Sequence, residues 1–180
     1  MRQEAMGKGR KADWVRIGAW LCWVVLALGC ARQARDHRPV VLGGLDAEEL
    51  FRRLPEWERG YREYQPDSAA VRVLREVQDP VEILVFLGTW CGDSEREVPH
   101  FMKALDVAGN RNLSVRYFGV PRNFREADDA AAQYDIQAVP TFLVRKGATE
   151  VGRIVERATA SIEADLAGIL ISAGLAGRGR

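Results

Sequence analysis

An apolar run at residues 81–88 places the strongest constraint on how this chain folds. The run reads Val-Glu-Ile-Leu-Val-Phe-Leu-Gly, has the length of one strand and carries a single charge. A strand that is apolar on nearly every position is typical of the buried centre of a sheet. A helix is expected to follow at once, from about Cys91 to Val107. The chain therefore passes from a central strand directly into a helix that begins at a cysteine.

The segments after this helix predict a mixed sheet. A strand is expected over 113–119, an Ala-rich helix over 124–134, a hairpin of strands 141–145 and 150–155, and an amphipathic helix over 161–173. The order β-α-β-α-β-β-α favours parallel pairing first and an antiparallel hairpin last. We therefore predict an α/β domain over residues 80–173, with a central mixed β-sheet flanked by helices, and a frayed tail at 174–180.

Short helices are predicted ahead of this domain, over residues 45–79. Asp46 fits the start of a capping box, Pro55 can begin a second helix, and Asp67 offers the cap of a third. Each helix has an apolar face. We expect an N-terminal helical extension that packs on the main domain. Three of its aromatic residues are expected to serve packing more than ligand binding: Trp57, Tyr61 and Tyr64.

The first 29 residues have the pattern of an export signal. A basic stretch ending at Arg16 precedes thirteen residues without a charge. That core is shorter than the about 20 apolar residues that span a bilayer comfortably, but it suits a signal peptide. The ending Leu26-Ala27-Leu28-Gly29-Cys30 resembles the bacterial lipobox, although Ala27 stands where leucine is usual. The resemblance implies lipid attachment at Cys30.

Residues 30–44 are polar and then Gly-rich, and are predicted to form a lipidated tether. The expected protein is exported and anchored to a membrane by the lipid, facing the periplasm or the cell exterior. An uncleaved short anchor and a simple secretory signal are the alternatives. Each of these also leaves the remainder of the chain on the far side of the membrane.

The cysteine count narrows the chemistry. Of the three cysteines, Cys22 lies in the signal core and Cys30 would carry lipid, so Cys91 is the thiol left in the mature protein. No metal site is expected, since two isolated histidines and one thiol lack ligand spacing. No cofactor is expected either. Beyond residue 29 the charge is slightly negative, with no basic stripe, so nucleic acid is not an expected partner.

The segment Phe86-Leu-Gly-Thr-Trp-Cys-Gly-Asp-Ser94, followed by Pro99, resembles the active-site segment of thioredoxins. Val139-Pro140-Thr141 and the hairpin after it resemble the thioredoxin carboxyl-terminal half. The resemblance covers roughly half of the chain and implies a thioredoxin-like fold. It also implies a cis Val139–Pro140 bond that faces Cys91, with the backbone of Val139 open to an extended substrate. The implied substrate-binding residues are Trp90, Gly92, Asp93, Val139, Pro140 and Thr141.

The implied catalytic residues are Cys91 and Ser94. A thiol at the start of a helix lies beside unpaired N–H groups and the positive end of the helix dipole, which favours the thiolate. Ser94 stands where thioredoxins have the resolving cysteine, so no internal disulfide can form. Its hydroxyl could still donate to the Cys91 thiolate. Asp93 and Val85 replace the usual proline and buried acid, and the charge of Asp93 would oppose the thiolate.

These departures leave two main hypotheses. The first is a membrane-tethered monothiol protein that exchanges disulfides with exported proteins bearing cysteines or disulfides, or with an external thiol. The motif and the Tyr-rich extension resemble a group of exported bacterial thioredoxin-family proteins. The second is a non-catalytic binding module that retains the substrate groove. A peroxiredoxin-type peroxidase is a weaker hypothesis, because the chain lacks the Pro-x-x-x-Thr/Ser-x-x-Cys motif that leads to the thiol in that family. His100 lies on the helix face opposite Cys91 and is expected to be ordinary surface.

Overall fold

The computed structural model describes residues 43–124 and 129–177. The predicted signal peptide, the lipid site at Cys30 and most of the predicted tether lie outside these residues. In the described part, a sheet of five strands has the order β1-β3-β2-β4-β5. The strands are β1 (Gly43–Leu45), β2 (Val81–Leu87), β3 (Leu113–Gly119), β4 (Thr141–Lys146) and β5 (Thr149–Val155).

Strand β2 lies at the centre of the sheet. It pairs in parallel with β3, in a register that sets Val85 opposite Tyr117. On its other side it pairs antiparallel with β4, which continues antiparallel into β5. The mixed sheet, the parallel pair and the terminal hairpin are those predicted, and the thioredoxin-like fold class is confirmed.

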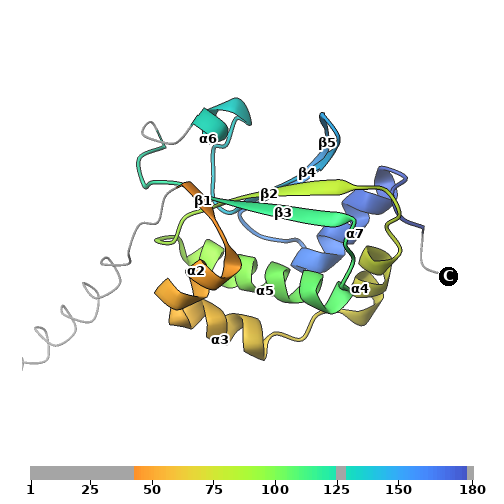
Figure 1. The fold of residues 1–180 in the computed structure, drawn as a ribbon, viewed down its shortest axis with the longest axis horizontal. Helices are drawn as coiled ribbons and strands as arrows, with labels where there is room; N and C mark the ends of the chain where they lie inside the picture. Colours follow the sequence, from red (N-terminus) through yellow and green to blue (C-terminus); the bar gives the residue numbers. More distant parts are fainter. Residues whose placement is uncertain (1–42, 125–128, 178–180) are drawn as a thin grey trace, which may run out of the picture. The chain divides into compact units, whose positions relative to one another are not determined.

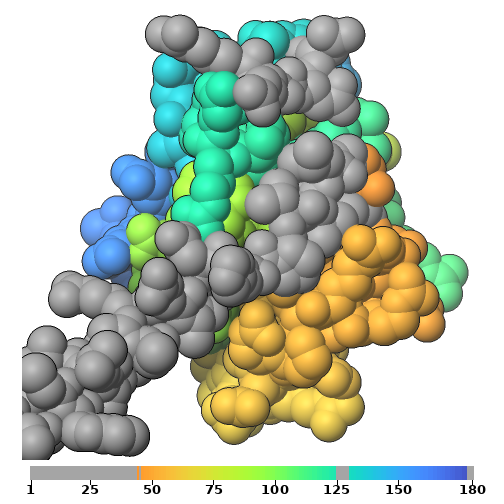
Figure 2. Space-filling view, turned by 90° about the vertical axis from the view of Figure 1, so that its left-hand side faces the viewer, coloured from red at the N-terminus to blue at the C-terminus, as the bar shows by residue number. Residues whose placement is uncertain are grey.

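Helices cover both faces of this sheet (Figure 1). One face carries α2 (Ala47–Arg53), α3 (Pro55–Glu63), α4 (Ser68–Arg75), α5 (Gly92–Ala108) and α7 (Ile162–Ser172), and the other carries α6 (Asp129–Gln133). In the space-filling view the orange and yellow surface of α2 and α3 lies at the opposite end of the face from the teal surface around α6 (Figure 2).

Side chains of β2 point alternately to the two faces of the sheet, and the buried apolar residues form one cluster on each face. Ile83, Val85 and Leu87 point to the larger cluster, which is shared with the five helices on that side. Leu84 and Phe86 point to a smaller cluster that contains Val139 and Ile136. Cys91 and Trp90 pack against the smaller cluster. The site is thus built where the central strand passes from one layer of the protein to the other.

The helices at 47–75 belong to the same core as the sheet. Leu50, Trp57 and Leu74 are fully buried in the larger cluster, together with Phe142 of β4. The two predicted caps form: Asp46 and Asp67 accept bonds from the first turns of α2 and α4. Pro55 begins α3 as expected. The expected extension packs on the main domain. The two share one hydrophobic cluster, so residue 80 is not a boundary between separate cores.

Two boundaries differ from the prediction. Residues 43 and 44, assigned to the tether, form β1 with Leu45 and pair antiparallel with the end of β3. Their glycines gave no periodic signal, because a residue without a side chain cannot show the alternation of apolar and polar positions that marks a strand. The predicted frayed tail begins too early: Leu175 is buried and its N–H donates to the carbonyl of Leu170, with Gly174 in a left-handed turn at φ 68°.

Within the described ranges, none of the helices combines the length and apolar character needed to cross a bilayer.

Candidate functional site

Cys91 is the N-cap residue of α5 and is partly exposed. Its backbone N–H donates to the Gly88 carbonyl at 2.8 Å, and its carbonyl accepts from Glu95 at 3.0 Å. Its thiol donates a hydrogen bond to the Val139 carbonyl, with a sulfur–oxygen distance of 3.2 Å. The Val139–Pro140 peptide bond is cis. The structure therefore brings together Cys91 and the Val139–Pro140 pair, which lie 48 residues apart in the chain.

A close packing of Gly88 and Trp90 shapes the turn before the cysteine. A Cβ at Gly88 would lie 2.7 Å from an atom of the Trp90 ring, so only glycine fits there. The Trp90 indole N–H donates to the Val120 carbonyl at 2.9 Å, and Arg122 lies over its ring at 5.4 Å from the centroid. The hydrogen bond to Val120 and the packing on Gly88 thus hold the Trp90 ring in one position next to Cys91.

Ser94 has a hydrogen-bond partner in the backbone of the turn before Cys91. Its side chain is fully buried and its hydroxyl oxygen accepts a hydrogen bond from the Gly88 N–H at 3.1 Å. This contact joins the first turn of α5 to the end of β2. The hydroxyl oxygen thus supplies the acceptor that the backbone of the tight turn needs. Its own proton takes no part in that bond, so the hydrogen bond to the Cys91 thiolate stays a prediction.

Asp93 also has partners that the motif did not reveal. One of its carboxylate oxygens, Oδ1, accepts from Arg96 and from Arg157, each at 3.0 Å. Arg96 additionally donates to Glu97 at 2.9 Å. The charge that Asp93 was expected to set against the thiolate is therefore balanced by two guanidinium groups. Arg157 lies 64 residues further along the chain, and no local pattern identified it.

The remaining predicted substrate-binding residues divide into two kinds. Gly92 is exposed, and a Cβ added there would meet nothing within 4 Å, so the start of α5 is open to an approaching chain. Thr141 is buried and its hydroxyl donates to the Ala138 carbonyl at 2.8 Å. Its side chain therefore stabilises the turn before Pro140 and does not face the surface.

A polar cluster lies on the face of α5 that the sequence assigned to ordinary surface. The His100 ring stacks on Tyr64 at 3.8 Å between centroids, and Tyr64 donates to both carboxylate oxygens of the buried Glu163. Burial lowers the pKa of His100 below its usual 6.5. The negative charge of Glu163 acts to raise this pKa, and the positive charge of Arg96 acts to lower it. Burial and the bond to Glu163 raise the pKa of Tyr64 to about 12. His100 is therefore partly buried, and not the ordinary surface residue that was expected, because Tyr64 at the end of α3 stacks on its ring.

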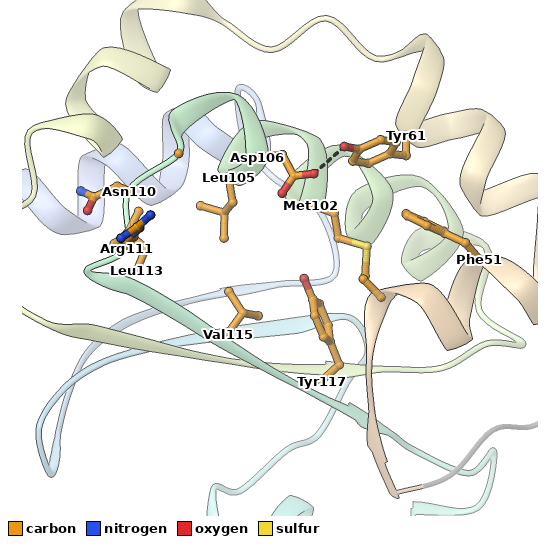
Figure 3. A pocket seen from close by; sticks show the side chains of 12 residues that line it. Phe51, Tyr61, Met102, Leu105, Asp106, Asn110, Arg111, Leu113, Val115 and Tyr117 are labelled. Atoms are coloured by element: carbon orange, nitrogen blue, oxygen red, sulfur yellow. Dashed lines mark hydrogen bonds between the residues drawn. The ribbon is translucent and has the colours of Figure 1, made fainter.

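A pocket of about 390 Å³ lies between β3, α5 and the first helices, away from Cys91 (Figure 3). The Tyr117 hydroxyl points from β3 toward α5, and Tyr61 donates to Asp106 on the far wall. The bond to Asp106 raises the pKa of Tyr61 to about 12. None of the predicted site residues lines this pocket. Over residues 43–124 and 129–177, no three side chains of metal-binding type come together.

A family model described as thioredoxin matches residues 48–166, more than half of the chain. The match begins within α2. In structure, a protein of unknown function from Pseudomonas aeruginosa has a TM-score of 0.55 at 19% identity, covering 66% of this chain and 84% of that one. At this identity the likeness shows the fold alone.

Two thioredoxins resemble the chain in sequence. A thioredoxin of Echinococcus granulosus is 31% identical over 77 residues, covering 43% of this chain and 66% of that protein. Thioredoxin H2-2 of Oryza sativa subsp. japonica is 34% identical over 73 residues, covering 41% and 50%. The chain thus spans between half and about two thirds of the length of these relatives. On the match to the family model over α2 to α7, the chain belongs to the thioredoxin family.

Proposed function

We propose that this protein performs thiol–disulfide exchange through a single thiol, Cys91, on exported protein clients. The observation that carries the proposal is the placement of Cys91 at the N-cap of α5 with its sulfur 3.2 Å from the Val139 carbonyl. Membership of the thioredoxin family supports the same class of chemistry. The motif Cys91-Gly92-Asp93-Ser94 restricts it to one thiol.

The proposed reaction starts from the Cys91 thiolate. Loss of the thiol proton to solvent ends the hydrogen bond to Val139, and leaves that carbonyl available to accept a backbone N–H from an extended client. The thiolate attacks one sulfur of the client disulfide. A bond forms between Cys91 and that sulfur, the client S–S bond breaks, and the other client sulfur leaves as a thiolate that takes up a proton.

A second thiol completes the cycle. Because Ser94 has no sulfur and is buried, the mixed disulfide must be attacked by another client thiol or by an external thiol. The attacking thiol loses its proton and its sulfur bonds to the client sulfur, while the bond from that sulfur to Cys91 breaks and releases Cys91 as a thiolate. The protein is neither oxidised nor reduced overall, which suits isomerisation or reduction by external thiols better than net dithiol oxidation.

The proposal includes attachment to a membrane through lipid on Cys30, facing the periplasm or the cell exterior. Mass spectrometry of the full chain extracted from membranes tests this part separately. We expect a peptide beginning at Cys30 with an acyl mass added. An unmodified Cys30 would limit the proposal to the exchange reaction.

The exchange is tested by trapping client adducts with the full chain, followed by nonreducing electrophoresis and peptide mapping. We expect mixed disulfides at Cys91 that disappear in Cys91→Ser. Absence of any Cys91 adduct, with other cysteines in the extract still reactive, would overturn the proposed exchange.

A second candidate function is a binding module that keeps the client groove without redox turnover. The burial of Ser94 and Val85 favours it, because both positions that complete a dithiol cycle serve the core instead. The same Cys91→Ser chain decides between the two. Client binding that survives this substitution unchanged supports the module, whereas loss of client capture supports exchange.

A further inference from the structure

Arg157 reaches the candidate site from a segment far from the motif. It is the second residue after β5, and its Nε donates to Oδ1 of Asp93 at 3.0 Å. Arg96 donates to the same oxygen, but Arg96 is also bonded to Glu97 and so bridges two carboxylates. The two arginines therefore differ. Both carboxylates that Arg96 binds lie within α5, whereas Arg157 joins the start of that helix to the chain after β5.

The backbone places Arg157 beside Pro140. The N–H of Glu156 donates to the Pro140 carbonyl at 2.8 Å, and Glu156 adopts a left-handed conformation at φ 60° that turns the chain after the strand. The N–H of Arg157 then donates to the Val155 carbonyl at 2.8 Å. Arg157 thus stands between the two segments that a client would contact, the Pro140 turn and the first turn of α5.

Exposure separates the roles of the two partners in this ion pair. The Asp93 side chain is 23% exposed and the Arg157 side chain is 69% exposed. Asp93 is therefore the inner, fixed partner, and it engages the Nε of the guanidinium. The bond to Asp93 uses Nε, so it leaves the terminal amino groups of this exposed side chain available to bind a carboxylate.

We propose that Arg157 is a specificity residue of the Cys91 site, which selects disulfides flanked by a carboxylate, and that Asp93 positions it. This inference rests on the proposed exchange reaction. Arg157 takes no part in the bond changes: the client S–S bond breaks and the Cys91–S bond forms while the guanidinium holds the client carboxylate. Glu95 and Glu156 are close in sequence, so the selection depends on direct contact with Arg157 and not on a net positive field.

The test compares two chromogenic disulfides on the full chain. Dithiobis(nitrobenzoate) is a dianion and dithiodipyridine is neutral, and the background from other cysteines is subtracted with Cys91→Ser. Arg157→Gln is expected to lower the rate with the dianion about three- to fivefold, the range of an exposed ion pair, and to leave the neutral rate unchanged. Arg157→Lys, which keeps the charge and loses the planar fork, should retain part of the dianion rate.

The control is Arg62→Gln, because Arg62 is 72% exposed and is also paired to a single carboxylate, Glu58, away from the site. It should change neither rate. Equal loss with both disulfides in Arg157→Gln would show that Arg157 acts on the thiol or on the fold, and would overturn the specificity role. So would no change with either disulfide. A chain whose Cys91 reacts with neither disulfide overturns the proposed exchange itself, whereas equal reaction in all variants overturns only the inference about Arg157.

Discussion

The Tyr64 hydroxyl donates to both carboxylate oxygens of Glu163, at 3.0 and 2.9 Å, across 99 residues of sequence. Glu163 is 1% exposed and also accepts from the Asp67 N–H at 2.8 Å. A buried carboxylate that loses a donor costs about 1–3 kcal/mol or more. We expect Tyr64→Phe to lower the free energy of unfolding by that amount in urea titrations.

Tyr61→Phe is the matched control for Tyr64→Phe. The Tyr61 hydroxyl donates to Asp106, which is exposed to solvent. Water can replace this donor, so Tyr61→Phe should lower the free energy of unfolding less than Tyr64→Phe does. Equal losses in the two variants would mean that Glu163 gains no special stabilisation from Tyr64.

The pKa of His100 predicts a loss of stability in mild acid. Burial holds this pKa below the usual 6.5, so the unfolded chain binds a proton more readily than the folded one. The stability from neutral His100 is complete above pH 6.5 and is lost as the pH falls through the lowered pKa. We expect His100→Gln to flatten the curve of unfolding free energy below pH 6.5 relative to the unchanged chain. An unchanged slope in this variant would assign the acid sensitivity to other groups.

Ser94 allows the structural and the chemical role of its hydroxyl to be separated. In Ser94→Ala the buried Gly88 N–H loses its acceptor, which should cost about 1–3 kcal/mol of stability. If acceptance from Gly88 is the whole role of the hydroxyl, the rate of Cys91 alkylation should stay near that of the unchanged chain. A strong fall in alkylation without a loss of stability would instead favour the hydrogen bond to the thiolate that the motif predicted.

Trp57 tests whether the helices before β2 are part of the folding unit. Trp57 is fully buried in the core shared with the sheet, so Trp57→Ala should cost about 3–5 kcal/mol. We expect the far-ultraviolet and the near-ultraviolet circular dichroism of this variant to change in one coincident unfolding transition, at a lower urea concentration than for the unchanged chain. Val107→Ala, at a side chain that is 40% exposed, should shift it little. A separate early transition in Trp57→Ala would identify an independent extension.

Strand β2 and helix α5 show what can be predicted from local pattern. The apolar run at 81–88 corresponds to β2 at 81–87, and the helix expected over 91–107 is α5 at 92–108. Periodicity, caps and turns involve neighbours within a few residues, so they can be recognised before the chain is folded. The hairpin that ends in β5 was predictable for the same reason. Lipid on Cys30 stays a prediction, because it lies outside the described residues.

Cys91 itself was evident from the sequence as the thiol at the start of α5. The tertiary structure decided what surrounds it. Asp93 pairs with Arg157 across 64 residues, Ser94 bonds to Gly88, and His100 is covered by a helix that precedes it. Each of these partners depends on how whole elements pack, and a side chain can satisfy its charge or hydrogen bonds in several ways until that packing selects one. The sequence by itself determined the central strand β2, helix α5 and the thiol between them. The packing of α3, α5 and the chain after β5 decided which charges and hydrogen bonds surround that thiol.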